Sequence, residues 1–282
     1  MAPLPPTSLT TKSVHDISEA ARAKFRDAIR PIYGINDKGD PDHIGSSILI
    51  FLDGKHYLLT AAHVIDHNQR TSLYLGADGF TELEFEVLMT SKPEDDRTKD
   101  HNDFAIAELN HTYVSKLSTA KFITENEINF SDDASESRLY ACIGFPNSKN
   151  KISRHKTTSI IPKIGLYSGI GKPTSILHNI ANVDDHILVG HNSKRSRDGE
   201  SGKIVNSIGL SGFSGGAIID IGPKTAAASS SDVTFGPKLT ALLIEKHDAE
   251  GVILGTRLTT ICRTMQPAQQ APAADSATAE PA

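Results

Sequence analysis

The apolar runs of this chain are short and closely spaced, which limits the folds that it can adopt. Two of them, 44–52 and 56–60, are separated by Asp53-Gly54, a dipeptide that favours two-residue hairpin turns. Further short runs, which we expect to be strands, lie at 72–75, 83–89, 139–145, 156–165, 175–180, 186–189, 217–221, 239–245 and 251–258. Short strands with frequent turn signals and little sustained helical periodicity predict an all-β protein of the barrel type.

One segment departs from this strand-rich pattern. Residues 13–29 place apolar side chains near helical spacing, with charged residues off that face. Ser13 is the expected N-cap, because a serine hydroxyl can accept a hydrogen bond from a free N–H of the first turn. We therefore expect a helix that packs on the outside of the domain, within an N-terminal extension of residues 1–31. Residues 265–282 are rich in Ala, Pro and Gln, and we expect them to form a disordered tail.

Composition narrows the function classes. Of the 282 residues, 38% are hydrophobic, enough for one large or two small domains. The net charge of −5 does not favour a nucleic-acid binder. The two cysteines, Cys142 and Cys262, are too few for a disulfide framework, which favours a reducing compartment. The N-terminus has no apolar run of signal-peptide length and no stretch is long enough to span a bilayer, so we expect a cytoplasmic protein that binds neither membranes nor nucleic acids.

The stretch that most suggests chemistry is 209–219, which reads GLSGFSGGAII. In it, Ser214 is flanked by Gly212, Gly215 and Gly216. Serine is a weak nucleophile at its own pKa, so a catalytic serine needs a base and donors for an oxyanion. Flanking glycines allow a tight turn that points backbone N–H groups at a reacting carbonyl. Taken alone, the pattern also fits a plain turn between two strands.

Two other stretches contain what such a serine needs. His63 follows an apolar strand in YLLTAAHVID (57–66), and Asp103 opens the alternating strand DFAIAEL (103–109). The histidine, the aspartate and the serine come in the order of the chymotrypsin-type triad. Residues 32–264 resemble the trypsin/chymotrypsin-like serine peptidases, in their bacterial-type form, through Thr60-Ala61-Ala62-His63, Asp103-Phe104-Ala105 and Gly212-Phe213-Ser214-Gly215-Gly216.

The resemblance implies a fold of two antiparallel six-stranded β-barrels. The first would span residues 32–130 and contain His63 and Asp103. The second would span residues 131–264 and contain Ser214. The polar stretch around 130–138 would link the two barrels.

The resemblance also implies a mechanism. A peptide bond would be hydrolysed through an acyl-enzyme, with Ser214 as nucleophile and His63 as general base and then general acid. Asp103 would orient the imidazole, and the backbone N–H groups of Gly212 and Ser214 would form the oxyanion hole. Such an enzyme needs neither a cofactor nor a metal. Its partner would be a protein or peptide substrate. A regulatory protein is a further expected partner, on separate grounds: a cytoplasmic protease without a zymogen switch needs some other restraint.

One departure from the resembled family concerns activation. In trypsin and chymotrypsin, an aspartate before the nucleophile pairs with a new N-terminus after zymogen cleavage. Phe213 stands at that position and cannot accept an ammonium group. We therefore expect that this chain is not activated by insertion of a new N-terminus.

A second departure concerns specificity. Ile208 stands six residues before the serine, where trypsin has the aspartate at the floor of its pocket. A buried substrate cation would lack a partner there, so a preference for Lys or Arg at P1 loses its main support. The candidate specificity residues are Ile208, Lys246 and Gly251. They leave open an apolar P1 side chain or an acidic one met by Lys246 or His247.

Other functions fit parts of the sequence less well. The His63 and His67 pair is close to a zinc-hydrolase pattern, but the residues before it are strand-like rather than helical. Residues 169–174 are similar to a phosphate-binding loop, yet Pro173 stands where Ser or Thr would bind magnesium. The main alternative is a catalytically silent or partner-gated protein of peptidase-like fold that binds peptides or partner proteins.

Overall fold

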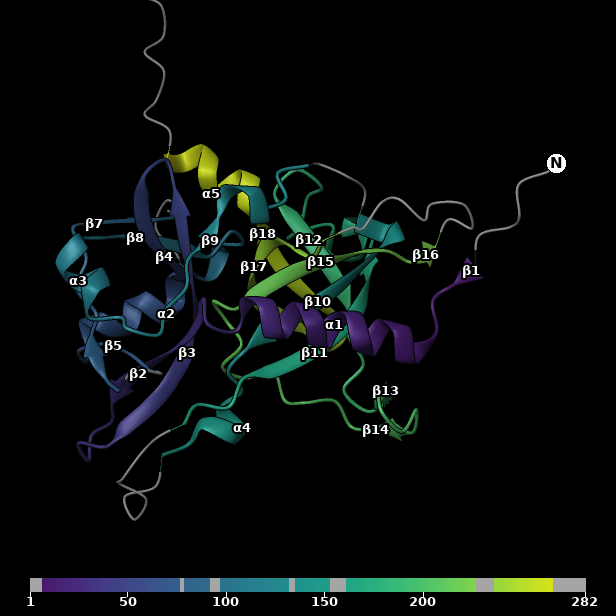
Figure 1. Cartoon of the computed structure of the whole chain (residues 1–282), viewed down its shortest axis with the longest axis horizontal. Helices are drawn as coiled ribbons and strands as arrows, with labels where there is room; N and C mark the ends of the chain where they lie inside the picture. The colour runs from purple at the N-terminus through teal and green to yellow at the C-terminus, as the bar shows by residue number, and fades with distance from the viewer. Residues whose placement is uncertain are drawn as a thin grey trace, which may run out of the picture.

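The computed structural model of the chain describes residues 7–76, 79–91, 97–131, 135–152, 161–226 and 236–265 (Figure 1). Within these ranges strands predominate, and most helices are short connections. From residue 266 onward, the tail expected over 265–282 lies outside the described residues. So does the first half of the strand expected at 156–165, and in its described half, 161–165, only Gly165 belongs to a strand. No helix of the described ranges has both the length and the apolar character that a membrane crossing requires.

The N-terminal helix is present as α1 (Thr11–Phe25), shifted from the expected bounds of 13–29. Thr10, not Ser13, is the N-cap, because its hydroxyl accepts the Ser13 N–H at 3.1 Å. The helix ends at Phe25 because the chain soon joins a sheet, in which Ile29 is the first paired residue. The apolar face of α1 packs against strands of the closed barrel described below (Figure 1). Phe25 on this face is buried, with 1% of its surface exposed.

The first half of the chain forms an open, curled sheet. Its strand order is β6-β5-β2-β3-β4-β8-β7, and β9 pairs in parallel with β3. The pairings among described residues do not close the sheet, so the expected first barrel is seen only as a half-barrel; its edge strands, of two and four residues, offer few backbone groups for closure. The strands are β2 (Ile29–Ile35), β3 (Pro41–Leu52), β4 (Lys55–Ala61), β5 (Tyr74–Leu75), β6 (Thr81–Glu82), β7 (Val87–Thr90), β8 (Phe104–Leu109) and β9 (Ile123–Thr124).

The hairpin expected at Asp53-Gly54 is confirmed. It joins β3 to β4, with Leu52 paired to Lys55 across the turn. Both turn residues have positive φ angles, 50° at Asp53 and 77° at Gly54, as a two-residue turn matched to the twist of the strands requires. This turn sets the register of the strand that leads to His63.

The second half forms a closed barrel in the order β10-β11-β12-β18-β17-β15. Its strands are β10 (Arg138–Gly144), β11 (Gly165–Lys172), β12 (His186–Gly190), β15 (Ala217–Pro223), β17 (Lys238–His247) and β18 (Val252–Arg257). The expected strand at 175–180 is wrong: Thr174–Leu177 is a 3₁₀ helix, which begins after Pro173 and buries Leu177. The chain leaves the barrel through a helix that the sequence did not predict, α5 (Leu258–Met265).

Short elements complete the described chain. The helices are α2 (Ala62–Asp66), α3 (His111–Ser115) and α4 (Asn147–Asn150). The remaining strands form two small ribbons, β1 (Thr7–Ser8) with β16 (Thr225–Ala226) and β13 (Ser196–Arg197) with β14 (Ile204–Val205). Both cysteines, Cys142 and Cys262, are free.

The two halves meet at Ser46, a fully buried residue of β3. Its backbone N–H donates to the carbonyl of Ser214 at 2.8 Å, and its hydroxyl donates to the carbonyl of Gly212 at 2.8 Å. The same hydroxyl accepts the N–H of Phe145 at 2.9 Å. Ser46 of the half-barrel therefore binds the serine loop of the closed barrel at two of its carbonyls.

Because α1 contributes to the core of the closed barrel, we expect Phe25→Ala to destabilise the protein. Removing a buried phenylalanine side chain typically costs about 3–5 kcal/mol of unfolding free energy. Urea denaturation followed by circular dichroism would measure the loss. The matched control is Lys12→Ala, on an exposed position of the same helix, for which we expect a change below about 0.5 kcal/mol. Equal stability of Phe25→Ala and the wild type would contradict the packing of this helix.

Candidate active site

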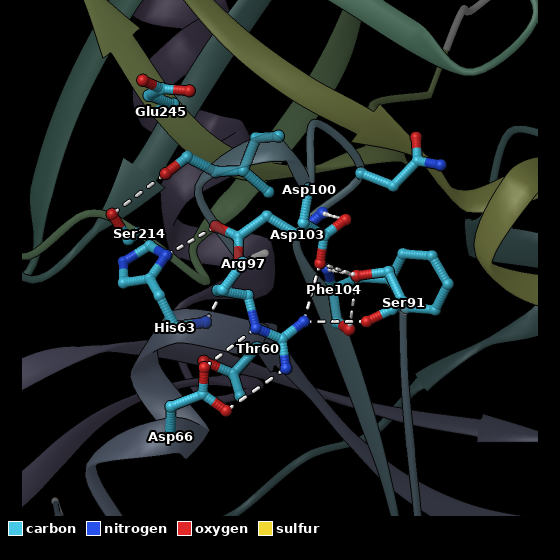
Figure 2. Close-up of polar contacts among 12 residues, drawn as sticks. Thr60, His63, Asp66, Ser91, Arg97, Asp100, Asp103, Phe104, Ser214 and Glu245 are labelled. Carbon is cyan, nitrogen blue, oxygen red and sulfur yellow. Dashed lines mark hydrogen bonds and ion pairs between the residues drawn. The ribbon is translucent and has the colours of Figure 1, made fainter. Parts of the chain in front are cut away.

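His63 and Asp103 lie side by side because their strands are paired. β4 and β8 are antiparallel neighbours with Ala61 opposite Phe104, so the residues just beyond these positions meet at one end of the sheet. Asp103 Oδ2 accepts a hydrogen bond from His63 Nδ1 at 2.5 Å, and Asp103 Oδ1 accepts the His63 backbone N–H at 3.0 Å (Figure 2). The carboxylate therefore fixes both the position of the residue and the orientation of its ring.

Asp103 has an unusual backbone conformation. Its φ angle is +37°, in a region that costs most non-glycine residues about 1–3 kcal/mol. Two backbone hydrogen bonds stabilise it: the Asp103 N–H donates to Asp100 Oδ1 at 3.0 Å, and the Asp103 carbonyl accepts the Ala62 N–H at 3.0 Å. The backbone turns here so that the side chain faces His63.

An arginine ties the aspartate loop to the helix that carries the histidine. Arg97 Nε donates to Asp66 Oδ2 at 2.9 Å, on α2. Its guanidinium also donates to Asp100 Oδ2 at 2.7 Å and to the Ser91 carbonyl at 2.8 Å (Figure 2). Because Asp100 in turn binds the Asp103 N–H, these contacts link Asp103 to the helix of His63 through a second route.

The closed barrel holds the same loop from the other side. His186 Nε2 donates to the His101 carbonyl at 2.9 Å, while its Nδ1 accepts the Asn182 N–H at 3.2 Å. The Thr256 hydroxyl donates to the Asn102 carbonyl at 2.6 Å. Burial lowers the pKa of His186, in keeping with a neutral ring that has one donor and one acceptor nitrogen.

The surroundings of His63 favour its protonated form. Burial acts to lower its pKa, but the hydrogen bond and the charge of Asp103 outweigh this effect, with smaller contributions from Asp66 and Glu245. The pKa of His63 is therefore raised above its usual value. A base whose protonated form is stabilised in place is suited to accept a proton during a reaction.

Gly215 of the serine loop leaves no room for a side chain. Gly215 has φ +84°, and a Cβ atom there would lie 2.0 Å from the Ser46 carbonyl oxygen and 2.4 Å from the Thr60 hydroxyl. Thr60 belongs to the strand that leads to His63, so this contact brings the serine loop against the histidine strand. Figure 2 shows the Ser214 side chain beside the His63 ring.

The Ser214 hydroxyl does not bind the imidazole in this structure. It donates to the carbonyl of Ile244 at 3.1 Å (Figure 2). Ile244 lies at a register shift of β17, between Leu243 and Glu245. It has no paired residue in β18. His63, Asp103 and Ser214 are thus brought together, but the hydrogen-bond chain is complete only between the first two.

The two backbone groups expected to bind an oxyanion are oriented by their neighbours. A planar trans peptide points its C=O and N–H in opposite directions. The Phe213 carbonyl accepts the Gly216 N–H at 2.7 Å, which turns the Ser214 N–H the other way. In the described part of the chain, neither the Ser214 N–H nor the Gly212 N–H donates to an acceptor of the protein.

The candidate specificity residues have partners of their own. Lys246 Nζ forms an ion pair with Asp248 at 2.7 Å. Gly251 has φ +66°, and its carbonyl accepts the His191 N–H at 2.7 Å. Ile208 is half-buried and packs against the apolar cluster beneath the serine loop. An acidic P1 side chain would therefore compete with Asp248 for Lys246.

Several residues that shape the site carry no sequence signal. Arg97 and His186 lie outside any recognisable motif, and their role depends on partners far along the chain. Near Ile208, His191 Nε2 and Ser207 Oγ lie 3.0 Å apart, a polar contact that the sequence did not suggest.

No family model matches the chain, and no curated protein matches it either. The function proposed below therefore rests on the geometry of the site.

We expect Asp103→Asn to lower the pKa of His63. The carboxylate opposes the effect of burial, so without its charge the pKa of His63 should fall to or below its usual value of about 6.5. An NMR titration of the histidine ring signals, with the His63 signal assigned through His63→Gln, measures the change. The exposed Asp16 offers a control, since Asp16→Asn should leave this pKa unchanged. A pKa unaffected by Asp103→Asn would contradict the pairing.

Proposed function

We propose that the chain is a serine endopeptidase of the trypsin/chymotrypsin-like type, which hydrolyses peptide bonds through an acyl-enzyme. The observation that carries this proposal is the 2.5 Å contact of His63 Nδ1 with Asp103 beside a serine loop whose Gly212 and Ser214 amides are free. An oriented imidazole, an adjacent hydroxyl and two free donors are the groups that acyl transfer needs. The half-barrel and the closed barrel also support a chymotrypsin-like fold of two barrels, over residues 32–130 and 131–264.

In the proposed mechanism, His63 accepts a proton and gives it back in each of two steps, acylation and deacylation. The Ser214 oxygen attacks the substrate carbonyl carbon and its proton passes to His63 Nε2. Asp103 stabilises the imidazolium, and the N–H groups of Gly212 and Ser214 bind the oxyanion. The imidazolium then gives its proton to the leaving amine, which separates and leaves the acyl-enzyme. Water attacks the ester with His63 again as base, and the released Ser214 regains its proton.

The Ser214 hydroxyl must first leave the Ile244 carbonyl. That bond joins two neutral groups, and its net strength is of the order of 1 kcal/mol. Because Ile244 lies at a register shift, its carbonyl can accept the backbone N–H of an extended substrate. A substrate bound in this way would release the hydroxyl to His63.

The same contact favours one alternative. A chain in which Ser214 stays bonded to Ile244 would hold peptides without cleaving them. This is the catalytically silent or partner-gated protein that the sequence left open, with a regulatory protein as the partner that realigns the serine. The free state of Cys142 and Cys262 supports our proposal of a cytoplasmic location.

A fluorophosphonate probe separates the two functions, because it labels only a serine activated as a nucleophile. We expect the wild type to be labelled and to hydrolyse unfolded casein, and Ser214→Ala to do neither. His63→Ala should also lose labelling, since the serine would lack its base. The probe signal on a gel, with casein digestion by the same samples, measures both. The exposed Ser148→Ala serves as the control and should be labelled like the wild type.

The outcomes are distinct. Labelling together with hydrolysis supports the endopeptidase. Peptide binding by a wild type that is neither labelled nor able to hydrolyse casein supports the silent binding protein and refutes the enzyme.

We also propose that activity needs no new N-terminus. Phe213 is fully buried, and a Cβ atom at either Gly144 or Gly165 would come within 3.1 Å of its ring, so an apolar side chain fills this space. The segment from which a new terminus would come is already part of the sheet as β2, with Pro31 opposite Ser46. Cleavage there would cut a buried strand beside the residue that joins the two halves.

We therefore expect the protein to be fully active without cleavage, so that its mass stays that of the intact chain throughout the assay. Intact mass spectrometry at each time point, combined with fluorophosphonate labelling, makes this measurement. Cleavage engineered at residue 31 should lower activity and the melting temperature together. Activity that arises only after a cut near residue 31 would refute the proposal.

A further inference from the structure

A pair of polar side chains outside the triad lies directly beside the proposed oxyanion hole. His43 belongs to β3 and Asn147 opens α4, next to β3 in Figure 1. The His43 Nδ1–H donates to Asn147 Oδ1 at 2.5 Å. The other end of the same amide, Nδ2, donates to the Ser211 hydroxyl at 3.1 Å. Asn147 thus connects the half-barrel to the residue that precedes Gly212.

The backbone of Asn147 adds a second contact to the same residue. Its N–H donates to the Ser211 carbonyl at 2.7 Å. Since the C=O and N–H of a trans peptide point in opposite directions, this bond turns the Gly212 N–H away from Asn147. The N–H that results is the free one, which the proposed mechanism uses as an oxyanion donor.

Gly212 by itself would not keep this orientation. Its φ angle is +90°, and without a Cβ atom a glycine adopts several backbone conformations at little cost. The pair packs closely against it: a Cβ at this position would lie 2.1 Å from Asn147 Oδ1 and 2.8 Å from His43 Cε1. The peptide before Gly212 therefore lies on the His43–Asn147 pair.

His43 is buried with only one of its two ring nitrogens hydrogen-bonded to a neighbouring side chain. Only 5% of the residue is exposed, and its Nε2 has no hydrogen-bond partner among the described residues. A buried nitrogen without a partner costs stability, and an apolar ring in its place would avoid that cost. The ring is kept here with a donor for Asn147, and the bond to that amide is the contact that the ring makes.

We infer that His43 and Asn147 are positioning residues, which hold the Ser211–Gly212 peptide with its N–H directed into the oxyanion hole. The inference rests on the proposed function. Neither side chain needs to touch the substrate. They act by disfavouring a flip of one peptide, which would withdraw one of the two donors.

The test is steady-state hydrolysis of a peptide substrate by variants of the pair. Complete loss of one oxyanion donor costs about 10²–10³ in kcat, so partial loss of its orientation in Asn147→Ala should lower kcat about 10–100-fold. KM should stay within about threefold, because the ground-state carbonyl depends less on this donor. Ser148→Ala, on the next residue of the same short helix and exposed, is the matched control and should retain the kcat of the wild type.

Two further variants separate positioning from folding. His43→Phe removes the buried nitrogen that has no partner but also the donor to Asn147 Oδ1, so these two effects on the melting temperature oppose each other, while kcat should fall as in Asn147→Ala. His43→Gln keeps an N–H donor for Asn147 and should restore most of kcat. In the double variant His43→Phe/Asn147→Ala, the loss should be no larger than in either single variant, because both act on one peptide.

Wild-type kcat in a folded Asn147→Ala variant would overturn the inference and leave the proposed function intact. So would losses of kcat that only follow the melting temperature, with no rescue by His43→Gln. A wild type that is not labelled by the fluorophosphonate would instead remove the proposed function and this inference with it.

Discussion

The geometry of the site depends on one buried serine that joins the two halves of the protein. Ser46 donates to the Ser214 carbonyl through its N–H and to the Gly212 carbonyl through its hydroxyl, while that hydroxyl accepts the Phe145 N–H. Loss of the hydroxyl would leave two backbone groups without partners in the interior, each at a cost of about 1–3 kcal/mol. Because β3 also pairs with the strand that leads to His63, the register of one hairpin places the Ser214 loop relative to His63.

Asp103 shows why so many polar contacts surround this site. Its strained backbone, with φ +37°, is stable only if the neighbouring structure opposes relaxation. Asp100 and Ala62 bind its backbone within the half-barrel, while His186 and Thr256 bind the two preceding carbonyls from the closed barrel. The aspartate is therefore positioned by both halves. A change in the relative position of the halves would move Asp103 and, through its hydrogen bond, the His63 ring.

The sequence predicted what depends on local patterns. Short motifs singled out His63, Asp103 and Ser214. The Asp53-Gly54 dipeptide predicted the hairpin that fixes the register of β4, the strand that leads to His63. The sequence did not predict Arg97 or the open edge of the half-barrel, because both depend on pairing between distant residues rather than on spacing along the chain. The expected strand at 175–180 failed for a related reason: a short apolar run after a proline fits a 3₁₀ turn as well as a strand.

The Ser214 hydroxyl has one possible acceptor in each half of the protein. Its acceptor, the Ile244 carbonyl, belongs to the closed barrel, whereas His63 belongs to the half-barrel. The loop that carries the serine is bound by Ser46, so its backbone keeps one position relative to both acceptors. Leaving the Ile244 carbonyl costs one neutral hydrogen bond, about 1 kcal/mol. Enzymes lower a barrier by roughly 8–23 kcal/mol, so in the proposed acyl transfer the resting orientation would affect when the serine is aligned far more than how fast the aligned serine reacts.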